Sequence, residues 1–242
     1  MDRMIYLSMS GAKATMQRQE VLANNLANVS TTGFRAELAA FRAVPVRGDG
    51  ASTRVYTLET TTGIDQSAGP IQTTGRPLDV AMRGNAWLAV QGLDGTEAYT
   101  RAGHLQVTPE GQLVTPQGLP VLSDGGPIQL PANTEVSIGQ DGTISARQPN
   151  GTSTPVARLK LVTPEQVLKR GDDGLFRSPE GDLPQDPLAR LQDGALEGSN
   201  VSAIETMVAM ISAARQFEAQ MKMLQTAEKD EQGAQRLLSL QG

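Results

Sequence analysis

Both ends of this 242-residue chain carry largely apolar residues that recur at steps of three and four. This spacing puts a stripe along one face of a helix and is typical of a coiled coil. Near the start the stripe is Ile5, Met9, Ala12, Met16, Gln19, Ala23 and Leu26; near the end it is Val201, Ile204, Val208, Ile211, Ala214, Phe217, Met221 and Leu224. Ser202 and Glu205 have the spacing of a capping box, and the helix that they begin continues to about residue 239. We therefore expect two long helices that pair with each other.

The middle of the chain has a different residue pattern, with short runs of strand-forming residues separated by glycine-containing turns. Asp94-Gly95, Asp141-Gly142 and Asn150-Gly151 are dipeptides that supply the positive φ of tight hairpins. Residues 76–195 are therefore predicted to form an all-β domain of short antiparallel strands. Residues 36–75 contain few apolar positions in register and are predicted to be an extended connector.

The expected fold class is α+β, with the β domain inserted between the two halves of a helical unit. Residues 1–35 form the N-terminal helix of the coiled-coil core in this prediction, and residues 196–242 form the C-terminal helix.

Catalytic signals are sparse. The chain has no cysteine and one histidine, His104, so a metal site would depend on carboxylates and a Ser-His-Asp triad would have to use that residue. We expect His104 to be a partly exposed strand residue, and Trp87, the only tryptophan, to anchor the β core. A carboxylate pair that acts on glycosides stays open, although the aromatic residues that stack on sugars are few. The expectation is no enzyme activity, no cofactor and no metal.

Charge and hydropathy narrow the possible partners. The net charge is -5 and no basic stripe is present, which argues against nucleic acid as a partner. No apolar run reaches the roughly 18 residues of a membrane span, and the first 20 residues lack the apolar core of a secretory signal. We expect no membrane insertion and no cleaved signal peptide.

Three stretches resemble the flagellar axial proteins that build the rod and the hook. They are LANNLANVSTTGFRAE near the start, QTTGRPLDVAMRGNAWLAVQGLDGTEAYTRAGHLQVTPEGQLVTPQGLPVL in the middle and LEGSNVSAIETMVAMISAARQFEAQMKMLQTAE near the end. Together they cover well over half of the chain, in the order of the family. The opening MDRMIYLSMSGA and the ending QTAEKDEQGAQRLL are most similar to the proximal-rod members. Trp87 and His104 depart from the family, in which phenylalanine is common at both places.

This resemblance implies a structural subunit of the flagellar basal-body rod that helps to transmit torque for motility. Its terminal helices would pack with those of neighbouring subunits in a homo- and hetero-oligomeric rod that spans the periplasm. The implied partners are other proximal-rod subunits, the distal-rod protein and the flagellar export apparatus. A distal-rod or hook-type member is the nearer alternative, and a carbohydrate-binding or carbohydrate-processing β domain on a helical stalk is the alternative from another class.

The resemblance also suggests why the segment ANNLANVSTTGF, residues 23–34, holds three asparagines, each of which costs a helix up to about 0.7 kcal/mol. We expect Asn24 and Asn25 to hydrogen-bond across a subunit interface, and Asn28 with Gly33 to end the helix. The implied subunit interface is Asn24, Asn25, Leu26, Asn28, Gly33, Phe34, Asn200, Val201, Ile204, Val208, Ile211, Phe217, Met221 and Leu224.

Overall fold

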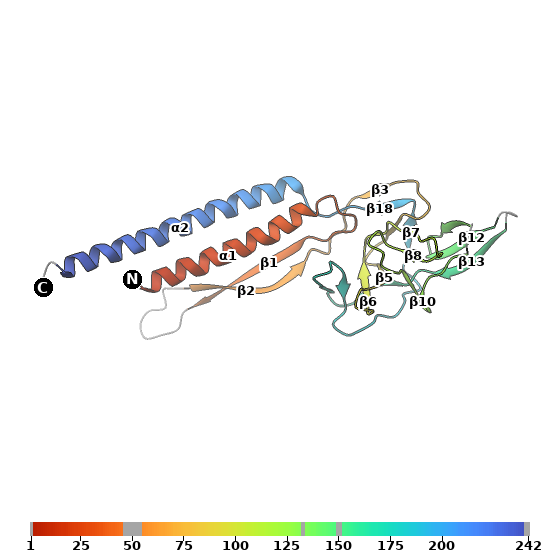
Figure 1. The fold of residues 1–242 in the computed structure, drawn as a ribbon, viewed down its shortest axis with the longest axis horizontal. Helices are drawn as coiled ribbons and strands as arrows, with labels where there is room; N and C mark the ends of the chain where they lie inside the picture. Colours follow the sequence, from red (N-terminus) through yellow and green to blue (C-terminus); the bar gives the residue numbers. More distant parts are fainter. Residues whose placement is uncertain (1, 46–54, 132–133, 149–151, 240–242) are drawn as a thin grey trace. The chain divides into compact units, whose positions relative to one another are not determined.

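The computed structural model describes residues 2–45, 55–131, 134–148 and 152–239, and the chain divides into two compact units (Figure 1). The helical unit consists of residues 1–29, 35–66 and 201–242. The β unit consists of residues 30–34 and 67–200. The many short antiparallel strands together with two long helices make this an α+β protein, as expected.

The helical unit combines two antiparallel helices with a hairpin (Figure 1). Helix α1 spans Asp2–Ala27 and helix α2 spans Ala203–Ser239. Strands β1 (Glu37–Pro45) and β2 (Val55–Ile64) pair antiparallel and pack along α1.

The β1–β2 hairpin replaces much of the extended connector that was expected over residues 36–75. Ala39 and Phe41 are half-buried, whereas Leu38 and Ala40 between and beside them are exposed. A strand that covers one face of a helix needs apolar residues only at alternate positions, and such a short pattern is easily missed in a Thr- and Gly-rich sequence.

The two helices meet along a seam that mixes small and large side chains. Because α2 packs chiefly against α1, its less exposed positions mark the seam. They include Thr206, Met210, Ala213, Phe217, Gln220, Leu224 and Ala227, of which Thr206, Ala213 and Ala227 are buried. They alternate by four and three residues, so a heptad pattern is present. On α1, Ser8 and Ala12 are buried.

The seam follows the stripe predicted from the sequence only in part, since Ala12 of α1 and Phe217 and Leu224 of α2 belong to both. Ile204, Val208 and Ile211 are 77%, 62% and 56% exposed. They precede Thr206, Met210 and Ala213 by two residues, which is about 200° around a helix, so they lie on the side away from the seam. Met9 and Met16 of the expected α1 stripe are likewise exposed, while the neighbouring Ser8 is buried.

The β unit is built from small antiparallel sheets. A five-stranded sheet has the order β14-β5-β6-β16-β15, with β5 Trp87–Gln91, β6 Glu97–Thr100, β14 Leu161–Val162, β15 Lys169–Arg170 and β16 Phe176–Arg177. A three-stranded sheet contains β11 Glu135–Ile138, β12 Thr143–Arg147 and β13 Ser153–Arg158. The two-stranded pairs are β3 Ile71–Thr73 with β18 Ala195–Glu197, β4 Val80–Met82 with β17 Leu191–Asp193, β7 Gln106–Val107 with β8 Leu113–Val114, and β9 Leu122–Ser123 with β10 Gly126–Pro127.

One apolar cluster fills the β unit, with Met82, Leu88, Leu105 and Ile144 among its fully buried members. Trp87 is buried, and its ring lies 4.7 Å from that of Phe176, centroid to centroid, so its expected role as a core anchor is confirmed. Two predicted turns are also confirmed, since Gly95 and Gly142 have φ of 79° and 84°. The turn expected at Asn150-Gly151 lies outside the described residues.

Candidate assembly surface

Most of the large exposed apolar residues of the helical unit form two stripes. The α2 stripe, as we name it, consists of Ile204, Met207, Val208 and Ile211, each at least half exposed. The seam lies on the other side of α2, so these side chains stay largely uncovered by α1. A contiguous exposed apolar face of this kind marks a surface for interaction.

The α1 stripe consists of Tyr6, Met9 and Met16, each about half exposed. Their spacing of three and seven residues places them on one face of the helix. Lys13 is exposed within the same face.

The other C-terminal residues predicted for the interface lie in mixed environments. Phe217 and Leu224 are half-buried in the seam, whereas Met221 is exposed. Val201 and, on α1, Leu26 are half-buried. The predicted set therefore combines residues of the seam with residues of an outward surface.

The side chains of all three asparagines make hydrogen bonds within the chain that the sequence did not indicate. The Asn25 Nδ2 donates to the backbone oxygen of Glu37 at 2.9 Å, and the Glu37 N–H donates to Asn25 Oδ1 at 2.9 Å. Asn25 is 6% exposed and its amide ties β1 to α1, while the intersubunit bond expected for it stays a prediction. Asn28 Nδ2 donates to the backbone oxygen and to Oδ1 of Asn24 at 2.9 and 3.0 Å, and α1 ends just before it at Ala27.

Gly33, Phe34 and Asn200 belong to the β unit, where they join separate passes of the chain. The Gly33 N–H donates to the Glu197 oxygen at 2.8 Å, and the Asn200 N–H donates to the Phe34 oxygen at 3.3 Å. Asn200 Nδ2 also donates to the Ser67 oxygen at 3.0 Å. Gly33 and Phe34 are buried and have a structural role within the chain, and the subunit contact expected for them stays a prediction.

Gly33 is required by its geometry. Its φ of +69° is in the left-handed region, and a Cβ there would lie 2.2 Å from the carbonyl carbon of Arg101. Phe34 lies against the guanidinium of Arg170, whose central carbon is 4.6 Å from the ring centroid.

A buried ion pair that sequence reasoning missed lies beside these residues. Arg101 Nε donates to Glu197 Oε2 at 2.6 Å, and the two side chains are 2% and 1% exposed. The remaining guanidinium N–H groups donate to backbone oxygens, among them that of Met82 at 2.8 Å, and the Gly69 N–H donates to Glu197 Oε1 at 2.9 Å. Both charges are thus paired and hydrogen-bonded, as burial demands. The partners lie 96 residues apart, so no local pattern could have revealed them.

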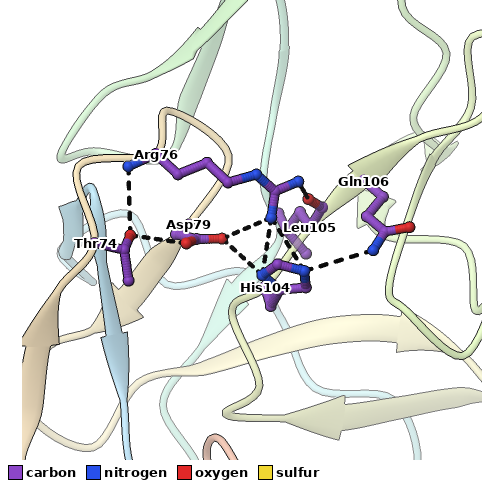
Figure 2. A network of polar contacts seen from close by, with 6 residues as sticks. All are labelled: Thr74, Arg76, Asp79, His104, Leu105 and Gln106. Carbon is purple, nitrogen blue, oxygen red and sulfur yellow. Dashed lines mark hydrogen bonds and ion pairs between the residues drawn. The ribbon is translucent and has the colours of Figure 1, made fainter.

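The single histidine belongs to a second polar network (Figure 2). His104 Nδ1 lies 2.9 Å from Asp79 Oδ1, and Arg76 Nη1 donates to the same oxygen at 3.0 Å. The Thr74 hydroxyl donates to Asp79 Oδ2 at 2.7 Å, and Arg76 Nη2 donates to the Leu105 oxygen at 2.7 Å.

This network lacks the arrangement of a hydrolase triad. The only hydroxyl drawn in it, that of Thr74, binds the carboxylate and not the imidazole, whose Nε2 faces Gln106 at 3.5 Å (Figure 2). The side chain of His104 is 33% exposed, so its expected partial exposure is confirmed, but the residue forms an isolated β-bridge with Asp79 and lies outside the strands.

Neither a metal centre nor a membrane-spanning helix is present among the described residues. They contain no group of three or more His, Cys, Asp or Glu side chains placed to hold a metal ion. None of the helices in the described part of the chain has the length and apolar character that a membrane crossing requires.

Comparison with family models of known proteins gives matches to three segments of the chain. Residues 5–35 match a family model described as flagella basal body rod protein, residues 81–146 match the flagellar hook protein FlgE/F/G D1 domain, and residues 192–237 match the flagellar basal body rod FlgEFG protein C-terminal model.

Similar curated proteins include the flagellar basal-body rod proteins FlgF of Salmonella typhimurium and of Escherichia coli K12. Each is 48% identical over 99% of this chain and 100% of its own length. The flagellar basal-body rod protein FlgG of Agrobacterium fabrum is 29% identical over 94% of this chain and 96% of its own.

Proposed function

The chain belongs to the FlgF family of flagellar basal-body rod proteins, and we propose that it enters the proximal part of the rod through its helical unit. As a member of that family it is a structural subunit of the basal body in the bacterial flagellum. In the proposal it has no catalytic activity, and it transmits torque between the subunits that it contacts.

The α2 stripe carries this proposal. Three of its residues, Ile204, Val208 and Ile211, follow heptad spacing, yet the structure leaves them more than half exposed. Such residues can complete a coiled-coil seam only with a helix from another subunit. Burying one large aliphatic side chain contributes about 1.5–3 kcal/mol, so covering the stripe would contribute substantially to the free energy of binding.

The partners in this proposal are other proximal-rod subunits and the distal-rod protein FlgG, with the export apparatus as an earlier contact. The choice of FlgG as a partner is supported by an alignment that covers nearly all of both chains, because it indicates that the two proteins share both units. The higher identity to FlgF, 48% against 29%, favours a proximal over a distal or hook position. We also propose export without a cleaved signal peptide.

The test is the substitution Ile211→Asp in a strain that lacks the native gene. Ile211 is 56% exposed, so the chain should fold normally, whereas a carboxylate buried in a subunit contact costs several kcal/mol. We expect Ile211→Asp to be missing from detergent-extracted basal bodies and swimming to be lost, while expression and export are unchanged.

Two control variants distinguish the effect of the position on the α2 stripe from the effect of an altered charge. Gln117→Asp adds the same carboxylate at an exposed turn of the β unit, and Asp141→Asn alters an exposed hairpin turn. Both variants should enter basal bodies like the unsubstituted chain. Retention of Ile211→Asp at normal levels, or a motile strain without any copy of the protein, would overturn the proposed function.

A further inference from the structure

A cleft of about 350 Å³ lies on the β unit and includes one residue of the network in Figure 2. Its apolar lining consists of three prolines together with Leu78, Val107, Leu130 and Val136. Arg76 of the network also lines the cleft, and it is the only charged residue among the described residues that do so. This volume is in the range of pockets that bind ligands, and the lining suits an apolar side chain next to a carboxylate.

The guanidinium of Arg76 is fixed in place while its charge remains partly exposed. Its Nη1 donates to Asp79 Oδ1 at 3.0 Å, and its Nη2 donates to the Leu105 oxygen at 2.7 Å (Figure 2). The side chain of Arg76 is 37% exposed and that of Asp79 is 4% exposed, so this ion pair presents a positive charge to its surroundings. A guanidinium has five N–H donors, more than these bonds use, so Arg76 can bind a further carboxylate.

The turn between β5 and β6 presents an apolar side chain of the kind that the cleft suits. Leu93 in this turn is 88% exposed, more than any other large apolar residue that the structure describes. The Gly92 N–H donates to the Thr96 oxygen at 2.8 Å, and the Gly95 N–H donates to the Gly92 oxygen at 3.0 Å. Because these bonds already fix the turn, little backbone freedom is lost when Leu93 enters a cleft.

A carboxylate follows Leu93 directly. The side chain of Asp94 is 51% exposed, whereas that of its ion-pair partner Arg177 is 30% exposed, so the more exposed charge of this pair is negative. Hydrogen bonds from the Thr96 side chain and backbone lower the pKa of Asp94, which keeps the carboxylate ionised at neutral pH. The turn thus combines an exposed leucine with a negative charge, and the cleft combines an apolar lining with a positive charge.

The other strongly exposed leucine of the β unit, Leu188, has the opposite electrostatic surroundings. It is 79% exposed, and the guanidinium groups of Arg158 and Arg190 donate to the backbone oxygen of the residue before it, at 3.2 and 2.9 Å. These two cations outnumber the nearby carboxylate of Asp186. They would approach Arg76 if this leucine entered the cleft, and like charges oppose such a contact. The turn between β5 and β6 is therefore the better match.

We propose that the β5–β6 turn of one copy of this chain docks in the cleft of a second copy, with Leu93 against the apolar lining and the Asp94 carboxylate on Arg76. The second copy is the partner because this chain carries both complementary surfaces. The inference rests on the proposed function in that the copies meet in the rod, but it uses the β unit and not the α2 stripe. The turn and the cleft are different surfaces, so the contact is head-to-tail and continues from copy to copy.

The absence of cysteine from the sequence allows a direct test by disulfide trapping. Purified full-length Leu93→Cys is mixed with Val107→Cys under mild oxidation, at the highest concentration at which both stay soluble. Leu188→Cys mixed with Val107→Cys is the matched control, because it also replaces a strongly exposed leucine. A disulfide needs Cα atoms within about 7 Å, so we expect at least about tenfold more mixed dimer from the first mixture than from the control.

A second substitution tests the charge. Asp94→Arg, added to Leu93→Cys, should lower the yield of mixed dimer severalfold, because it places an arginine opposite Arg76. The fluorescence of Trp87, which is buried in the β unit, checks that every variant is folded. Equal yields from the Leu93→Cys mixture and the control mixture would overturn the inference, as would a yield that Asp94→Arg leaves unchanged.

The same cysteine pairs are then trapped in isolated basal bodies. A crosslink between two copies of this chain is expected there, whereas crosslinks only to a different rod protein would refute the second copy as partner. If trapping fails while Ile211→Asp is missing from basal bodies, the inference is wrong and the proposed function stands. Normal incorporation of Ile211→Asp would refute the proposed function itself, whatever the result of trapping.

Discussion

Glu197→Leu should destabilise the β unit strongly, because it leaves the Arg101 guanidinium buried without its counter-charge. The substitution removes the 2.6 Å bond from Arg101 Nε and the 2.9 Å bond from the Gly69 N–H. Both side chains of the pair are no more than 2% exposed, so water cannot replace the lost partner. Breaking a buried pair costs about 3–5 kcal/mol, a large part of the 5–15 kcal/mol that stabilises a typical domain.

Urea unfolding followed by the fluorescence of Trp87 measures this loss, since the indole ring lies 5.8 Å from the Arg101 guanidinium carbon. The control is Asp94→Asn, which weakens the partly exposed ion pair with Arg177 and should change the midpoint far less. Replacing both partners, as in Arg101→Met with Glu197→Leu, should recover part of the lost stability. A loss below about 1 kcal/mol in Glu197→Leu would refute the reasoning, because a buried charge would then tolerate the loss of its partner.

Three further predictions follow from the structure. Gly33→Ala should destabilise the β unit by several kcal/mol in the same urea assay, because the added Cβ meets backbone at 2.2 Å and φ is positive. Asn25→Ala should cost about 1–3 kcal/mol and speed amide hydrogen exchange at Glu37, and unchanged exchange would contradict the tie between α1 and β1. The hydrogen bonds from Thr143 lower the pKa of Asp141 below 3.8. The stability from Asp141 is therefore present above that pH and is lost as the pH falls through the lowered pKa, and Asp141→Asn should flatten this acid dependence in thermal unfolding.

The heptad spacing of the termini was visible in the sequence, but the face that joins α1 to α2 was predicted only in part. A reading of periodicity selects the stripe with the largest apolar residues, here Ile204, Val208 and Ile211. At this end of α2 the helices instead meet through Thr206, Met210 and Ala213, which form an equally regular stripe. In the assembly that we propose, the exposed apolar stripe contacts the neighbour, and a single sequence does not say which stripe is used where.

Turns and buried residues were easier to predict from the sequence than contacts between segments that are far apart in the chain. The turn at Asp141-Gly142 and the buried Trp87 follow from dipeptide and residue preferences, and both were predicted. The tie from Asn25 to Glu37 and the pair of Arg101 with Glu197 depend on how separate segments meet in space. Helix propensity indicated only that Asn25 is unfavourable in a helix. The hydrogen bonds of its amide with the backbone of Glu37 in β1 offset this cost.

The exposed stripes also bear on when the chain assembles. The four α2-stripe residues are each at least half exposed, so covering them contributes about 3–6 kcal/mol if each gains half of a full burial. Association costs about 4–15 kcal/mol in lost rotational and translational freedom, so one such contact is marginal. We therefore expect the purified chain to sediment mainly as a monomer when dilute, and to associate when a growing rod end offers several contacts at once. A stable dimer at nanomolar concentration in sedimentation velocity would show that one contact suffices, because that affinity requires about −12 kcal/mol.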